Sequence, residues 1–77
     1  MPNADRILER LRRLPPEMRF SELETLLTAL GWEISHGKSS HLMLVSPKRS
    51  TITIALVKGR RVKRFYLRKI LDEIEIE

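Results

Sequence analysis

The chain of 77 residues contains no cysteine, which excludes a disulfide, a thiolate nucleophile and a cysteine-built zinc site. Long apolar runs are also missing. The longest, residues 42–45 and 54–57, have four residues each, whereas a membrane-spanning helix needs about 20. Charged residues stand at positions 5, 6, 9 and 10, where a signal peptide would carry its apolar segment. These absences predict a cytoplasmic protein without a membrane segment.

Aromatic residues are scarce, at 5% of the chain, so the sequence does not favour a protein that binds single strands by stacking on bases. The apolar share of 42% and the charged share of 32% are typical of a globular protein. A chain of this length accommodates one small domain. We therefore expect residues 1–77 to form a single domain.

Acidic residues are absent from residues 41–71, which hold nine lysines and arginines. Seven of these nine lie between Lys58 and Lys69. Residues 1–40 have six basic and six acidic residues, and four acids in residues 72–77 bring the net charge to +5. Such a concentration of positive charge attracts polyanions, and RNA, DNA or an acidic protein would fit. A solvated basic helix face is the alternative.

Two N-terminal segments have apolar residues at helical spacing. The first segment spans residues 3–14 and ends at two consecutive prolines. The second begins at a capping box formed by Ser21 and Glu24, and it ends at Gly31, which suits the C′ position. The apolar stripes are Ile7, Leu8, Leu11 and Leu14 in the first segment, and Leu23, Leu26, Leu27 and Leu30 in the second.

After Gly31 the apolar residues alternate, which predicts strands over residues 32–36, 41–45 and 51–57. A last helix follows. Connections as short as these favour an antiparallel sheet with helices on one face, an α+β fold. The inward stripe of the last helix is either Val62, Tyr66, Ile70 and Ile74, or Phe65, Leu67 and Leu71.

The chain has two histidines, His36 and His41, which flank the turn at residues 37–40. If these four residues form the hairpin loop, the two histidines face each other with Cβ atoms about 5 Å apart. Imidazole transfers protons near neutral pH, and RNA carries its own nucleophile, the 2′-hydroxyl. The pair is therefore a candidate for metal-independent RNA cleavage. The alternative is that both are ordinary residues at the end of a hairpin. Their spacing does not predict a metal site.

Three stretches of the chain resemble HicA-family toxins, small ribonucleases of bacterial and archaeal toxin–antitoxin systems. Residues 20–32, FSELETLLTALGW, resemble the opening helix of the family and its Leu-Gly-aromatic exit. Residues 36–41, HGKSSH, resemble a basic turn that ends in Gly-Ser-His, and residues 66–71, YLRKIL, a Leu-Arg-x-Ile-Leu run. The resemblance covers residues 19–74 as the core and leaves the helix at residues 3–14 as an extension.

The resemblance implies a fold like the double-stranded-RNA-binding domain, with an α-β-β-β-α core in the same order as the predicted elements. It also implies cleavage of mRNA, inhibition of translation, and a HicB-like antitoxin that covers the active site. Residue by residue, the catalytic histidine corresponds to His41 and the phosphate-binding turn to Lys38, Ser39 and Ser40. No cofactor is implied.

The sequence departs from the family pattern at two places. Ser39 replaces the glycine of the turn, and residues 55–57, Ala-Leu-Val, replace a Pro-x-His motif. The second histidine is therefore missing, and His36 is a candidate for its role. Two functions stay open, an endoribonuclease toxin that uses His41 and a non-catalytic module that binds double-stranded RNA or the antitoxin. The predicted RNA contacts are Lys38, Ser39, Ser40, Lys58, Arg60, Arg61, Lys63 and Arg64.

Overall fold

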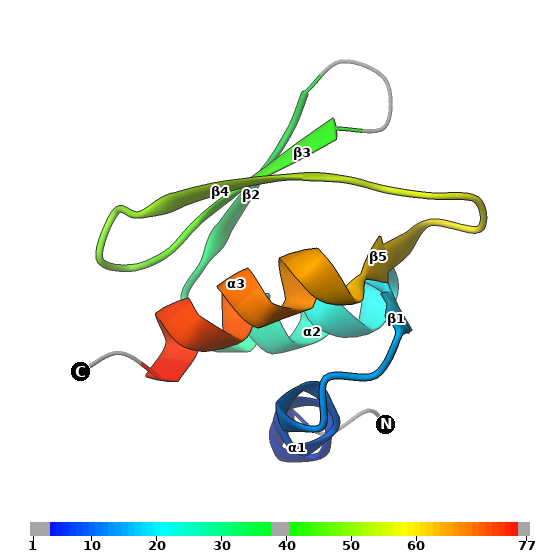
Figure 1. Ribbon diagram of the computed structural model, residues 1–77. Helices are drawn as coiled ribbons and strands as arrows, with labels where there is room; N and C mark the ends of the chain where they lie inside the picture. The colour runs from blue at the N-terminus through cyan, green and yellow to red at the C-terminus, as the bar shows by residue number, and fades with distance from the viewer. Residues whose placement is uncertain (1–3, 38–40, 76–77) are drawn as a thin grey trace.

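The computed structural model describes residues 4–37 and 41–75. Within these residues, three helices and five strands follow one another (Figure 1). In order they are α1 (Ala4–Arg12), β1 (Glu17–Arg19), α2 (Phe20–Ala29), β2 (Glu33–His36), β3 (His41–Val45), β4 (Thr51–Ala55), β5 (Arg61–Lys63) and α3 (Arg64–Glu75).

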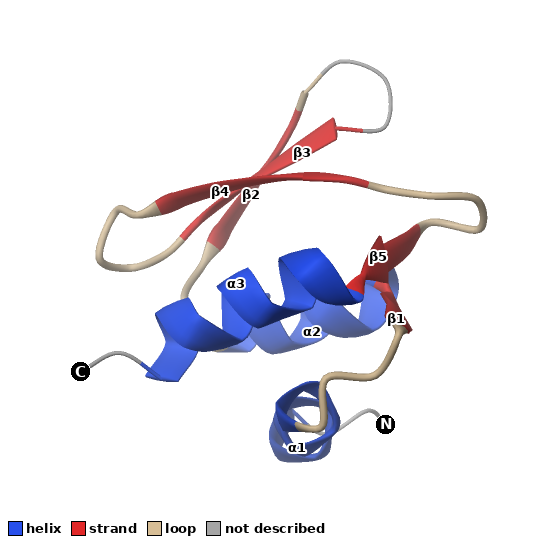
Figure 2. Ribbon diagram, in the orientation of Figure 1, coloured by secondary structure: helices blue, strands red, loops and turns tan. Residues whose placement is uncertain are grey.

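Strands β2, β3 and β4 form an antiparallel sheet in that order. Helices α2 and α3 both lie under one face of this sheet, and α1 lies beyond them on the side away from the sheet (Figures 1 and 2). The predicted α+β fold, with an α-β-β-β-α core and an additional N-terminal helix, is confirmed.

The core lies between the inner face of the sheet and the two helices beneath it. Alternate strand residues point inward because side chains alternate across a strand, and Leu42, Leu44 and Ile54 are buried in this way. They belong to the same cluster as Leu23 of α2 and Leu67 of α3. The alternating apolar pattern of these strands therefore identifies their buried face correctly.

The last helix buries a stripe that combines the two predicted ones. Its fully buried residues are Leu67 and Ile70, whereas Phe65 is 64% exposed. Val62 is buried too, but it belongs to strand β5, because the helix begins only at Arg64. Neither predicted stripe is correct as a whole.

A second, two-stranded antiparallel sheet joins β1 to β5 and was not predicted. Met18 pairs with Val62, and both are buried. Each strand has three residues, which is too short for a two-residue period to be visible in the sequence. This ribbon closes the end of the core from which α2 and α3 both begin (Figure 1).

Helix α2 begins one residue before the predicted capping box. Its N-cap is Arg19, whose side chain makes no capping hydrogen bond, and Ser21 lies within the first turn. The Phe20 amide instead donates to the carbonyl of Arg60, at 3.0 Å. A tertiary contact thus satisfies an amide at the start of the helix, and the predicted capping box is wrong.

The end of α2 is the one predicted from Gly31. Gly31 adopts a φ of 87°, its amide donates to the Thr28 carbonyl, and the Trp32 amide donates to the Leu27 carbonyl. This pair of bonds is the Schellman motif, which favours glycine because a side chain is strained in the left-handed region.

Helix α1 packs against both α2 and α3. Ile7 and Leu11 are buried, and Arg12 forms an ion pair with Glu75 near the end of α3 at 3.1 Å. The helix ends at Arg12, two residues before the predicted boundary. Its apolar side is therefore part of the hydrophobic core.

Candidate functional site

His41 is the first residue of β3 and lies on the outer face of the three-stranded sheet. Leu42 and Leu44 point to the helices, so His41 and Met43 point away from them, and both are exposed. None of the described helices covers this face (Figure 2). Across the strands, His41 pairs with Ala55, and Met43 pairs with Thr53. His41 therefore lies exposed on the face of the sheet that the described helices leave uncovered.

His36 does not face His41, and that prediction is wrong. In the observed register His36 pairs with Leu42, which places it on the inner face of the sheet, opposite to the face of His41. His36 is nevertheless exposed, because this end of the hairpin extends away from the helices (Figure 1). In this register the two histidines lie on opposite faces of the sheet.

Gly37 accounts for this shift by one residue. Its amide donates to the His41 carbonyl at 2.9 Å, so the ladder continues one residue beyond His36. A Cβ atom at this position would lie 3.2 Å from the His41 carbonyl oxygen, which is a tight approach that favours glycine. A register shift of one residue moves every side chain to the other face. The predicted contacts at Lys38, Ser39 and Ser40 lie outside the described residues.

The basic segment begins with a tight turn at residues 58–60. The Val57 and Arg61 backbones pair across this turn, with hydrogen bonds of 3.0 and 3.3 Å. Gly59 and Arg60 adopt φ values of 81° and 54°. The turn follows β4, whose last residue Ala55 pairs with His41. The start of β3 and the basic turn therefore lie toward the same end of the sheet (Figure 1).

The predicted basic contacts have different environments. Lys58 is exposed in the turn, and the Arg60 guanidinium lies 5.8 Å from the centre of the Phe20 ring. Arg61 and Lys63 are exposed on β5, and Arg61 forms an ion pair with Glu17 at 3.4 Å. The structure thus places Lys58, Arg60, Arg61 and Lys63 on one continuous turn and strand.

Arg64 differs from the other predicted contacts because it holds the linker between α1 and β1. Its Nε donates to the Leu14 carbonyl at 2.9 Å, and its amide donates to the Pro16 carbonyl at the same distance. These bonds tie the start of α3 to the linker, which gives Arg64 a structural role.

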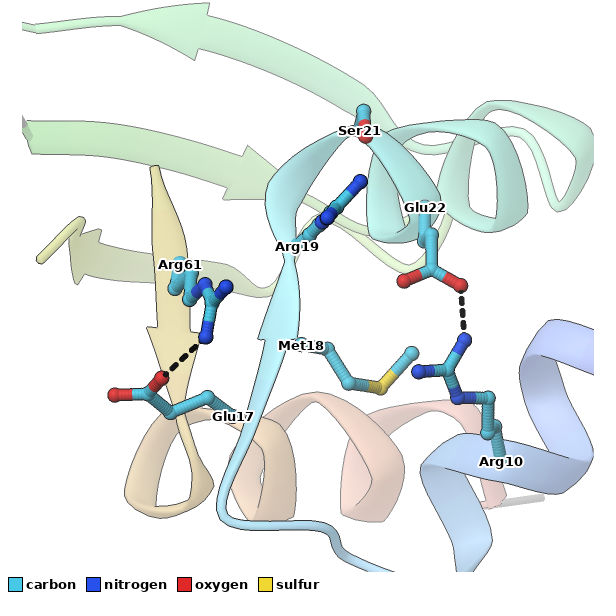
Figure 3. A pocket seen from close by; sticks show the side chains of 7 residues that line it. All are labelled: Arg10, Glu17, Met18, Arg19, Ser21, Glu22 and Arg61. Carbon is cyan, nitrogen blue, oxygen red and sulfur yellow. Dashed lines mark hydrogen bonds and ion pairs between the residues drawn. The ribbon is translucent and has the colours of Figure 1, made fainter. Parts of the chain in front are cut away.

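Arg19 is a further basic residue, and the sequence pattern did not indicate it. It pairs directly with Arg61 across the β1–β5 ribbon. It lines a hollow of about 450 Å³, where it lies between the ion pair of Glu17 with Arg61 and that of Arg10 with Glu22 (Figure 3). The sequence carries no signal for this position, since β1 and β5 lie far apart in the chain.

The described residues do not contain a group of three or more histidine and acidic side chains that could hold a metal ion. Over the same part of the chain, we find no helix with the length and apolar character of a membrane span.

A family model described as the HicA toxin of bacterial toxin–antitoxin systems matches residues 20–76. The match begins at α2, so it leaves α1 and β1 outside. Searches of curated proteins and of solved structures give no match.

Proposed function

Because the chain belongs to the HicA toxin family and is thus a toxin of a toxin–antitoxin system, we propose that it cleaves mRNA and that His41 is its catalytic residue. The position of His41 carries this proposal. The imidazole is exposed on the uncovered face of the sheet, toward the same end as the basic turn at residues 58–60.

The proposed reaction uses the substrate's own nucleophile. The 2′-hydroxyl attacks the adjacent phosphorus, the bond to the 5′-oxygen breaks, and a 2′,3′-cyclic phosphate forms. His41 either accepts the proton of the 2′-hydroxyl or donates one to the departing 5′-oxygen. Arginine and lysine side chains of the basic segment, residues 58–69, stabilise the negative charge that develops on the phosphoryl oxygens.

In our proposal, a single histidine transfers a proton in this reaction. His36 lies on the opposite face, and Val57 stands where the resemblance would place a second histidine. Water then has to supply the other proton transfer. We therefore expect a slower enzyme than one that has two proton-transfer groups.

The reaction can be tested with an RNA that lacks the nucleophile. We expect the purified protein to cleave a synthetic RNA between pH 6 and 8 in the presence of a chelator, and to leave cyclic phosphate ends. The same oligonucleotide with 2′-deoxy sugars should stay intact, because no attacking hydroxyl is present. Cleavage of the deoxy substrate, or cleavage that depends on a divalent metal, would contradict the proposed chemistry.

A non-catalytic module is the second candidate function, and the valine at position 57 favours it. Such a module would bind RNA or the antitoxin through the same basic residues and would not need an imidazole at position 41. RNA binding without any cleavage by the wild-type protein would support this alternative.

We also propose that a HicB-like antitoxin covers the outer face of the sheet around His41. Met43, 42% exposed on this face, offers an apolar contact beside the histidine. An interface of standard size buries about 1,600 Å² in total, so it would cover most of so small a sheet. In the cleavage assay, a HicB-like antitoxin that binds this protein should suppress activity, and Met43→Asp should weaken that suppression. Equal inhibition of the wild-type protein and of the Met43→Asp variant would indicate that the antitoxin binds another surface.

A further inference from the structure

The outer surface of the β1–β5 ribbon carries an uncompensated positive charge. Met18 and Val62 point into the core, so Arg19 and Arg61 point outward, directly opposite each other. Like charges at such a position destabilise a strand pair. Glu17 contacts Arg61 at 3.4 Å, whereas Arg19 has no ion-pair or hydrogen-bond partner among the described residues. An anion that binds between the two arginines would relieve this repulsion.

Arg60 adds a third guanidinium next to this pair. It adopts a positive φ of 54°, which is uncommon for a residue with a side chain. Its carbonyl accepts the Phe20 amide, which anchors the turn to the start of α2. Arg19, Arg60 and Arg61 line a common hollow of about 510 Å³. Three arginines from two distant parts of the sequence thus converge on one site.

This hollow adjoins two others along the ribbon, and we call the three hollows together the ribbon groove. The hollow of the three arginines shares Arg19 and Arg61 with the hollow in Figure 3, which in turn shares Glu17 with a third hollow lined by Pro16, Glu17, Lys63, Arg64 and Phe65. The groove therefore runs along the ribbon from the basic turn to the start of α3. Its basic residues outnumber its acidic ones; they are Arg10, Arg19, Arg60, Arg61, Lys63 and Arg64, against Glu17, Glu22 and Glu24.

Phe65 stands at the α3 end of the groove. Its side chain is 64% exposed, and the Lys69 ammonium lies 4.6 Å from the centre of its ring. A basic groove combined with an accessible aromatic ring is the arrangement that binds single-stranded nucleic acid. Bases in an A-form duplex are stacked on one another and are not available to such a ring.

We propose that the ribbon groove binds the phosphate backbone of single-stranded RNA and that Phe65 stacks on one of its bases. This inference rests on the proposed function, because it names the surface that holds the RNA substrate. It assigns two residues to RNA binding beyond the predicted basic contacts: Arg19, from an element that the family match does not include, and Phe65.

Substitutions of these two residues should have different effects on RNA affinity when it is measured as a function of salt concentration. In a His41→Ala background, which prevents cleavage during the titration, we compare a short single strand with a duplex of the same sequence. Arg19→Gln should lower the slope of log affinity against log salt by about 0.7 for each phosphate that the protein no longer neutralises. Phe65→Ala should weaken single-strand binding roughly 5- to 150-fold with an unchanged slope, and it should leave duplex binding as it was.

Matched controls come from outside the groove. Arg6→Gln removes an exposed positive charge from α1, and Leu30→Ala trims an exposed apolar side chain at the end of α2; both should bind RNA like the background protein. Thermal unfolding of each variant confirms that it is folded. If Arg19→Gln and Phe65→Ala bind like these controls, the groove is not the RNA surface.

Two further outcomes would also overturn the proposal. Equal losses for single strand and duplex in Phe65→Ala would exclude base stacking. Weaker binding of the antitoxin with unchanged RNA affinity would make the groove a protein interface. Cleavage by the wild-type protein is measured separately. The proposal that the groove binds RNA can therefore be contradicted while the proposed nuclease activity is supported, and the opposite outcome is equally distinguishable.

Discussion

Replacing His41 by alanine is expected to lower the rate of RNA cleavage by about 10²- to 10⁴-fold, which is the usual contribution of a general acid or base. RNA affinity should change little, because the groove that holds the backbone does not include His41. The fold should persist, with a change of about 1 kcal/mol or less in the free energy of unfolding, since the side chain is exposed at the end of a strand. Single-turnover cleavage of a labelled RNA, together with thermal unfolding, checks all three expectations.

His36→Ala is the matched control for this experiment. It removes the other imidazole of the same hairpin, five residues earlier in the chain and on the opposite face of the sheet. We expect it to cleave RNA like the wild-type protein. If His41→Ala retains full activity, the catalytic assignment is wrong; if both variants lose activity, our assignment of a single proton-transfer histidine is wrong.

Replacing Leu11 by alanine is expected to reduce the free energy of unfolding by about 2–5 kcal/mol. Leu11 is completely buried, and its helix packs against both α2 and α3. A folded chain of this size has a total stability of about 4–12 kcal/mol, so such a loss would remove a large fraction of it. Urea unfolding can be followed by the fluorescence of Trp32, the one tryptophan in the chain, which is buried.

The comparison with Leu30→Ala makes the Leu11 result specific. Both substitutions remove the same atoms, but Leu30 is 40% exposed, so its loss should be well below that of Leu11. If the two variants unfold at the same urea concentration, α1 is an appendage that the core does not need. The expected difference would instead show that residues 4–12, which lie outside the family match, fold with the core as one unit.

Much of the fold follows from the sequence alone, because the relevant interactions are local. Leu42 and Leu44 alternate with exposed residues, and that period of two identifies a strand with one buried face. Gly31 ends α2 as predicted, since the left-handed conformation of the C′ position depends on that residue and its neighbours. The family resemblance rests on the same local segments, and the match to residues 20–76 confirms it.

The arrangement of the candidate site depends more on tertiary structure than the fold does, so less of it could be predicted from the sequence. Whether His36 or Gly37 lies opposite His41 is decided by the register of the ladder, and a shift of one residue reverses the face of each side chain. The residues of the turn are compatible with either register. The packing of Ile34, Leu42 and Leu44 against the helices selects the observed one.

The ribbon groove could not be predicted from the sequence either. Each of its two strands is three residues long, and their pairing places Arg19 beside Arg61 although the two residues are far apart in the chain. Because residues 61–63 belong to this ribbon, α3 begins only at Arg64. As a result Val62 is buried in the core, whereas Phe65 is exposed to solvent. Local periodicity determined which segments are helices and strands, whereas long-range pairing decided which charges meet, because that pairing depends on contacts between segments far apart in the chain.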